Sequence, residues 1–144
     1  MNFKNESMFT RWFCRMVTAR GAKTIAIVGS MRQESGISDR YIAHSKFRGW
    51  IEFKYKWNCC SPLQRLFLGD MKAKHDVAMC CRFLPSLGRV TFEDELNDIH
   101  HQFEIVEMEF LGSDKDRGEA LLDHCALAWK KMQIAKGSRD IKCK

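Results

Sequence analysis

The sequence contains few of the features that mark disordered, fibrous or membrane-spanning chains. It has only two prolines and nine glycines among 144 residues, and no stretch of biased composition, which argues against a disordered or collagen-like chain. Its longest apolar runs, such as 24–28, fall far short of the ~20 residues that a membrane span requires. With 45% apolar and 29% charged residues, we expect one globular domain with a sizeable core and no membrane contact.

An even, regularly spaced set of cysteines is also missing. There are seven cysteines, including adjacent pairs at 59–60 and 80–81, and such pairs lack the gap of roughly two to four residues found in structural zinc sites. We therefore expect reduced thiols and no zinc site. The first fifteen residues carry four charged side chains and no continuous apolar segment, unlike a secretory signal. These features favour a cytoplasmic protein, or one in the host cytoplasm if it is phage-encoded.

The net charge of +6 is divided unevenly along the chain. Residues 1–56 hold eleven Lys and Arg against four Asp and Glu, residues 57–90 hold five against two, and residues 91–144 hold eight against twelve. The first two-thirds are therefore basic and the last third is acidic. A basic surface on a globular domain is typical of proteins that bind polyanions, of which nucleic acid is the commonest.

The spacing of apolar residues predicts an α/β domain. A helix is expected from Asn5 or Ser7 to about residue 19, then strands at 24–28, 40–44 and 50–56, with a loop at 29–38. Ser61 and Pro62 predict a helix start, and the strand at 77–83 that follows can be parallel to 50–56 through this crossover. A capping-box-like Thr91 predicts a helix at 91–101, followed by a strand at 103–110 and a helix at 113–136 that ends at Gly137.

The third strand carries the clearest chemical signal. Glu52 and Lys54 lie two residues apart, so both project from one face of a strand, and Asp39 lies at the start of the preceding strand. Carboxylates are hard ligands for Mg²⁺, and a nearby ammonium can orient a water or stabilise a pentavalent phosphate. This combination suits metal-assisted phosphodiester hydrolysis, whereas a solvent-exposed ion pair between Glu52 and Lys54 is the simpler alternative. A phosphate-binding loop is not predicted, because the glycines at 21 and 29 are not followed by Gly-Lys-Ser/Thr, and no organic cofactor is expected.

The order of these residues resembles the PD-(D/E)xK nuclease superfamily, and within it the VRR-NUC nucleases and the small Holliday-junction resolvases. The resemblance covers about residues 5–83 and rests on a G-x-x-D element, an E-x-K strand and a helix opened by serine, proline and glutamine: Gly36, Asp39, Glu52, Lys54, Ser61, Pro62 and Gln64. It implies a restriction-endonuclease-like core, αβββαβ with a mixed central sheet, at 1–90. Residues 91–144 then form a C-terminal αβα extension, packed on the core or at a dimer interface. Ser38 departs from the signature, which has proline before the aspartate.

The resemblance also implies roles for individual residues. Asp39, Glu52 and the backbone carbonyl of Phe53 would bind Mg²⁺, for which Mn²⁺ would substitute, and Lys54 would be the catalytic lysine. Glu6 matches the glutamate that family members place on the first helix, with a helix-dipole role as the alternative, and Gln64 matches the helix glutamine near the metal.

The expected function is a Mg²⁺-dependent endonuclease that acts on branched DNA as a homodimer. We expect the apolar helix stripe Leu121, Cys125, Ala128 and Met132 to pair across a two-fold axis. Basic residues expected to contact phosphates are Arg11, Arg15, Arg40, Lys46, Arg48 and Lys56, for which a solvated basic face is the alternative. Two other functions remain open: a restriction, mismatch or flap nuclease, and a non-catalytic nucleic-acid-binding module.

Overall fold

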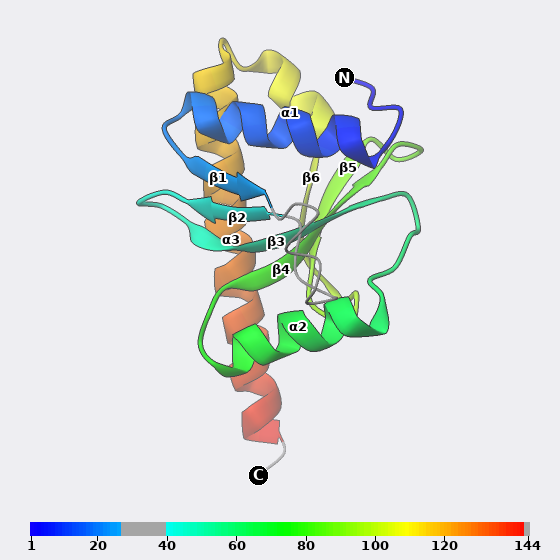
Figure 1. Ribbon diagram of the computed structural model, residues 1–144, viewed down its shortest axis with the longest axis vertical. Helices are drawn as coiled ribbons and strands as arrows, with labels where there is room; N and C mark the ends of the chain where they lie inside the picture. Colours follow the sequence, from blue (N-terminus) through cyan, green and yellow to red (C-terminus); the bar gives the residue numbers. More distant parts are fainter. Residues whose placement is uncertain (27–39, 143–144) are drawn as a thin grey trace.

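The fold is a three-layer α/β arrangement (Figure 1). The structure is a computed structural model that describes residues 1–26 and 40–142, with side chains described as far as residue 136. One mixed sheet has α1 (Glu6–Ala19) and α3 (Asp114–Lys142) on one face and α2 (Pro62–Ala73) on the other. The expected α/β class with a mixed central sheet is confirmed.

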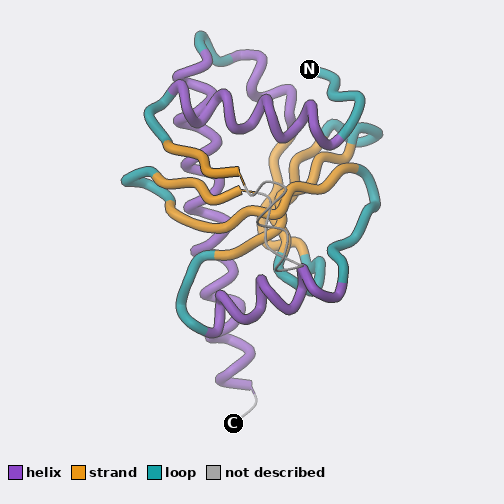
Figure 2. The backbone as a smooth tube through the Cα atoms, viewed as in Figure 1, coloured by secondary structure: helices purple, strands orange, loops and turns teal. Residues whose placement is uncertain are grey.

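The six described strands lie across the sheet in chain order. They are β1 (Lys23–Ala26), β2 (Arg40–Ala43), β3 (Arg48–Tyr55), β4 (Ala78–Leu84), β5 (Arg89–Glu93) and β6 (Ile99–Glu104). Each neighbouring pair is antiparallel except β3 and β4, which are parallel with α2 as their crossover. Figure 2 shows this layer of strands between α1 and α2. The predicted parallel pairing of the strands on either side of α2 is therefore confirmed.

Local sequence signals set the starts of the first two helices. The Asn5 side chain accepts a hydrogen bond from the Met8 N–H at 2.9 Å and caps α1, because the first N–H groups of a helix have no intrahelical partner. Ser61 caps α2, with Pro62 at the first helical position. Both starts agree with the sequence prediction.

The main core lies between the sheet and the pair α1 and α3. Phe9 and Phe13 of α1 pack against the Phe53 ring of β3, with ring centroids 5.8 and 5.1 Å away. All three side chains are completely buried. Because side chains alternate along a strand, this packing turns the neighbours of Phe53 on β3 toward α2.

The segment 91–110 differs from the prediction. Residues 91–101 do not form a helix but belong to β5, its turn and β6, and 105–110 form the 3₁₀ helix η2 (Ile105–Phe110) rather than a strand. The Thr91 hydroxyl donates to the Glu93 carboxylate at 2.6 Å instead of capping a helix. Asp94 accepts hydrogen bonds from the N–H groups of Leu96 and Asp98 and so stabilises the turn. The local capping pattern was outweighed by pairing of this segment with the edge of β4. The αβα order predicted for 91–144 is therefore wrong.

The helix predicted at 113–136 exists but continues through Gly137 to Lys142. Its apolar stripe of Leu121, Cys125, Ala128 and Met132 is at most 2% exposed within a single chain. These residues belong to the main core, together with residues of α1 and the sheet. The stripe is thus already covered, and the dimer interface predicted from it is wrong.

In the described part of the chain, no helix combines the length and the apolarity that crossing a membrane would require.

Candidate active site

The site begins with the alternation of side chains along β3. Ile51 and Phe53 enter the main core, so Glu52 and Lys54 project from the opposite face, toward α2. Their exposed fractions are only 2% and 9%, and the Lys54 Nζ lies 3.6 Å from Oε1 of Glu52. Burial in a medium of low dielectric strengthens the interaction of opposite charges and makes an unpaired charge costly. The solvent-exposed ion pair that was the simpler alternative does not describe these two residues.

Gln64 of α2 connects the two charged groups. Its Nε2 donates to Oε1 of Glu52 at 2.7 Å, and its Oε1 accepts from Lys54 Nζ at 3.1 Å. Only this amide orientation suits both neighbours, because a carboxylate only accepts hydrogen bonds and an ammonium only donates them. The structure therefore brings together three of the predicted site residues, Glu52, Lys54 and Gln64.

The cap of α2 fixes the position of Gln64. Its backbone N–H donates to the Ser61 Oγ at 3.1 Å, and its side-chain Oε1 accepts from the Ser61 N–H at 2.8 Å, which is a capping box. The helix is anchored by Leu68, which is fully buried in a small cluster with Cys60, Ala78 and Cys80. Gln64 is thus held both by its own helix and by the polar pair on β3.

The neighbouring strand extends this polar face. In the parallel register Glu52 pairs with Cys80, and Lys54 pairs with Arg82. Arg82 is 4% exposed and forms an ion pair with Glu93 of β5, with Nε 2.8 Å from Oε2. Glu93 also accepts the hydrogen bond from Thr91. The α2 face of the sheet therefore carries two adjacent buried ion pairs.

Two thiols lie beside these charges. Cys60 precedes the cap of α2, and a hydrogen bond from Cys80 lowers the pKa of Cys60 to about 7. The cations Lys54 and Arg82 act in the same direction. The six cysteines in the described part of the chain are free thiols, as expected from the sequence.

Two of the predicted metal-site residues, Asp39 and Glu6, are not among the residues that the structure brings together. Asp39 lies outside the described residues. Glu6 begins α1, which covers the sheet face opposite α2 (Figure 1), so the structure does not place it with Gln64. The side chain of Phe53 is buried in the main core, while its backbone lies between Glu52 and Lys54.

The predicted phosphate-binding residues come from several elements. Arg11 and Arg15 line a hollow of about 320 Å³ on α1 together with Trp12. Arg48 and Lys56 are exposed at the two ends of β3, and Arg40 is half-buried at the start of β2.

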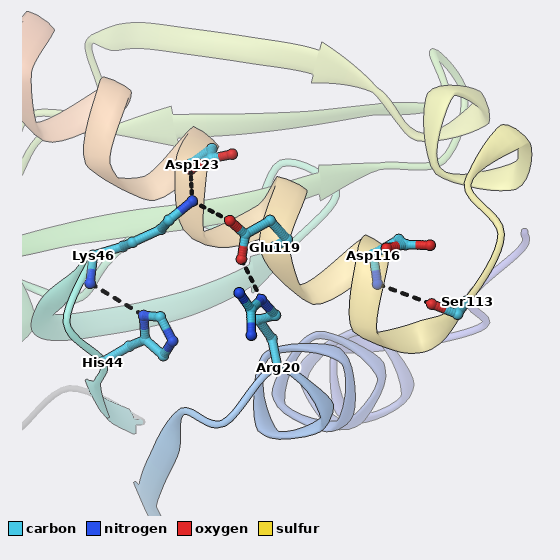
Figure 3. A network of polar contacts seen from close by, with 7 residues as sticks. All are labelled: Arg20, His44, Lys46, Ser113, Asp116, Glu119 and Asp123. Carbon is cyan, nitrogen blue, oxygen red and sulfur yellow. Dashed lines mark hydrogen bonds and ion pairs between the residues drawn. The ribbon is translucent and has the colours of Figure 1, made fainter.

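Lys46 lies in the turn between β2 and β3, in contact with α3 (Figure 3). Its ammonium pairs with Glu119 and lies 3.0 Å from Asp123, and these hydrogen bonds raise the pKa of Lys46. Glu119 also pairs with Arg20, the residue that follows α1. The Lys46 charge is therefore compensated within the chain.

Sequence reasoning missed Arg82, Glu93 and Cys80. Arg82 and Cys80 could have been found, because they lie two residues apart on the predicted strand 77–83, which pairs in parallel with the strand that carries Glu52 and Lys54. Glu93 could not, because its segment carried the signature of a helix start.

Among residues 1–26 and 40–142, no group of three or more His, Cys, Asp or Glu residues is arranged to hold a metal ion. Glu52 is the carboxylate that β3 contributes on the α2 face.

Comparisons of this chain with protein-family models, with curated proteins and with solved structures find no match.

Proposed function

We propose that this protein is a metal-dependent nuclease of the restriction-endonuclease-like type that hydrolyses phosphodiester bonds in DNA. The observation that carries the proposal is the hydrogen-bonded trio of the buried Glu52 and Lys54 with the half-buried Gln64 at the crossover between β3 and β4. An internal, desolvated acid and base pair stabilises a fold poorly compared with apolar residues. Its presence beside a helix cap on a parallel strand pair favours a role in chemistry.

Lys54 has the geometry of a group that acts on a phosphate. Its ammonium is held at a defined position by Gln64 and lies 3.6 Å from the Glu52 carboxylate. A preorganised cation in a dry site stabilises developing negative charge more strongly than the same cation in water. We therefore assign Lys54 to the stabilisation of the phosphate in the transition state, with Gln64 as the residue that positions it.

Glu52 has the donor chemistry of a Mg²⁺ ligand. Mg²⁺ prefers oxygen ligands, is commonly held by one or two carboxylates, and retains several waters, so one buried carboxylate on β3 fits such a site in part. The Phe53 carbonyl and Asp39 are the further ligands that the family resemblance implies. Bound Mg²⁺ would polarise the phosphate and lower the pKa of a bound water.

The register of β2 supports including Asp39 in this proposal. Arg40, the next residue in the chain, pairs with Ile51, which immediately precedes Glu52. The backbone at the start of β2 is therefore next to the strand that carries Glu52, because neighbouring strands lie about 4.8 Å apart.

The substrate part of the proposal rests on charge and on the resemblance. The first 56 residues contain eleven Lys and Arg against four Asp and Glu, which favours a polyanion. Branched DNA is the substrate class that the resemblance to VRR-NUC nucleases and resolvases implies, and flap or mismatch cleavage would use the same site.

A non-catalytic nucleic-acid-binding module is the second candidate. The observation that favours it is that Glu52, Lys54 and Gln64 already satisfy one another by hydrogen bonds, as structural polar groups do. In that case DNA would bind without any dependence on divalent metal.

Cleavage assays separate the two candidates. Labelled four-way junction, flap, duplex and single-stranded DNA are incubated with Mg²⁺, Mn²⁺ or EDTA. Lys54→Ala is expected to reduce cleavage by at least about 100-fold, the range for removing one preorganised electrostatic contact, and to change DNA affinity only a few-fold because binding is spread over many phosphates. Lys72→Ala is the matched control, because Lys72 also pairs with a glutamate, Glu95, at 2.7 Å, but lies at the far end of α2.

Two results would contradict the proposal. One is full cleavage by Lys54→Ala, and the other is DNA binding by the wild-type protein with no cleavage in either metal. Isothermal titration with Mn²⁺ adds an independent readout, since Glu52→Gln is expected to weaken metal binding while it retains the bond from Gln64.

A further inference from the structure

A hollow beside the candidate active site has features that the proposed cleavage chemistry does not use. This hollow, called the Trp57 pocket below, has a volume of about 140 Å³ and is lined mainly by Trp57, Arg82, Leu84, Glu93, Asn97 and Ile99. Its lining comes from the loop after β3, from β4, β5 and β6, and from the β5–β6 turn.

The Trp57 pocket lies close to Lys54 and Glu52. Arg82 is the register partner of Lys54 on β4, and Glu93 pairs with Cys80, which in turn pairs with Glu52. Adjacent strands are about 4.8 Å apart, so the pocket is one to two strands, or roughly 5–10 Å, from the two charged groups. Roughly this distance separates a phosphate from the base of an adjoining nucleotide.

Trp57 is a prepared aromatic platform. Its side chain is 71% exposed and also borders a second hollow of about 260 Å³ lined by Lys56, Leu84, Pro85 and Ser86. The ring therefore presents a large apolar face that a flat ligand can cover, and covering such a surface is favourable. A ring between two hollows can accept a flat ligand against it.

Hydrogen bonds fix the backbone on either side of Trp57. Arg82 Nη1 donates to the carbonyl oxygens of Lys56 at 2.6 Å and Asn58 at 2.5 Å, the residues on either side of Trp57. The same guanidinium is fixed by Glu93. The buried Arg82–Glu93 ion pair thus orders the loop before any ligand binds, which lowers the entropy cost of binding.

Asn97 supplies a polar group that lacks a partner within the described residues. Its Oδ1 is buried without a hydrogen bond, and the residue lines the Trp57 pocket. Leaving a buried polar atom unpaired costs free energy, so a ligand with a hydrogen-bond donor on its edge would be favoured there. An aromatic platform, an apolar wall of Leu84 and Ile99 and the amide of Asn97 in the lining together suit a nucleobase.

We propose that the Trp57 pocket binds an unpaired nucleobase of DNA, next to the phosphate that approaches Lys54. This inference rests on the proposed function and narrows it to DNA with at least one unpaired nucleotide at the cleavage position. A base in a duplex is stacked and paired, so only an unpaired one reaches such a pocket without the cost of flipping.

Binding of DNA containing 2-aminopurine tests the pocket without cleavage. The full chain is titrated, in EDTA, into a flap DNA with one unpaired 2-aminopurine and into the matched, fully paired duplex. Stacking on Trp57 is expected to quench the fluorescence of the unpaired base, and the flap is expected to bind more tightly than the duplex. Trp57→Ala should abolish the quenching and weaken flap binding by about 5- to 150-fold, the range for loss of one base–aromatic stack, with duplex binding unchanged.

Two further variants sharpen this test. Asn97→Gly should weaken flap binding by about 2- to 10-fold, as expected for one hydrogen bond, while quenching is retained. Glycine tolerates the positive φ of 64° at this position. Phe110→Ala is the matched control, because Phe110 is an 84% exposed aromatic residue on η2, and it should change nothing.

The outcomes distinguish the pocket from the nuclease. If Trp57→Ala leaves both quenching and affinity unchanged while the wild-type protein cleaves DNA, the pocket inference is overturned and the proposed function stands. If Trp57→Ala abolishes quenching but no DNA is cleaved in Mg²⁺ or Mn²⁺, the pocket stands and the nuclease proposal is overturned. Failure of the wild-type protein to bind either DNA would overturn both.

Discussion

The contact between α1 and α3 makes Gly118→Ala a decisive test of the packing. A Cβ at position 118 would lie 2.0 Å from the Met16 carbonyl oxygen, 2.8 Å from its carbonyl carbon and 3.0 Å from Cβ of Arg20. Ordinary contact begins at 3.4 Å, so the helices must separate locally by roughly 1.4 Å. The obstacle is helix backbone, which cannot rotate away as a side chain can.

The expected magnitude combines two opposing effects. Overpacking of this kind costs about 1–3 kcal/mol, and contact with backbone places Gly118→Ala toward the upper end. Alanine favours a helix over glycine by about 1 kcal/mol. We expect a net loss of about 2 kcal/mol, equivalent to a fall of about 4–8 °C in the unfolding midpoint for a chain of this length.

Gly69→Ala in α2 is the matched control. There the nearest atom to an added Cβ is Glu95 Cγ at 3.7 Å, which is an ordinary contact, so only the gain in helix propensity remains. The midpoint should rise by about 2–4 °C for a gain of about 1 kcal/mol. Both variants are measured by thermal unfolding followed by circular dichroism. A Gly118→Ala protein as stable as the wild type would refute the close approach of α1 and α3.

Three further predictions follow from buried or capping charges. Arg82→Met leaves the Glu93 carboxylate buried without its cation and should lower the free energy of unfolding in urea by about 3–5 kcal/mol. Arg89→Ala, which removes an exposed ion pair with Glu104, should lower it by less than about 1 kcal/mol. Equal losses in the two variants would contradict the burial of the Arg82–Glu93 pair. Burial, assisted by the charge of Lys131, lowers the pKa of His101 to about 4, so the neutral form of His101 is favoured in the folded state. The free energy of unfolding should therefore be highest above pH ~6.5 and fall by about 2–3 kcal/mol as the pH is lowered to 4. His101→Gln should reduce this pH dependence. If Glu6 serves the metal site, Glu6→Gln should lower cleavage at limiting Mg²⁺ with little change in melting temperature. Unchanged cleavage would leave Glu6 only the helix-dipole role of an acid in the first turn of α1.

The part of the site built from short-range patterns could be predicted. Glu52 and Lys54 share a face because side chains alternate along a strand. Gln64 lies near them because a Ser-Pro start and a capping box place it in the first turn of α2. The parallel pairing of β3 and β4 follows from the intervening helix. The ligand role of Asp39 came from its carboxylate and its place before the strand as well as from family resemblance, and that of Glu6 came from the resemblance; both stay predictions.

The errors lay where a local signal competed with a distant partner. Thr91 carries the signature of a helix cap, but its segment forms a ladder of backbone hydrogen bonds with β4. The Thr91 hydroxyl donates a hydrogen bond to the buried Glu93 carboxylate. Propensity is worth tenths of a kcal/mol per residue and yields to such pairing.

The sequence by itself therefore determined the α/β class, the starts of α1 and α2, and the shared face of Glu52 and Lys54, because each depends on neighbours within a few positions. Tertiary structure alone decided that the stripe at Leu121 is covered by the chain's own α1 and sheet rather than by a second copy. It also decided that Lys46 is compensated by Glu119 and Asp123 of α3, more than seventy residues away. Sequence spacing shows that a helix has an apolar face, or that a charged residue has no local partner. Which element covers that face, or neutralises that charge, is decided only when the whole chain has packed.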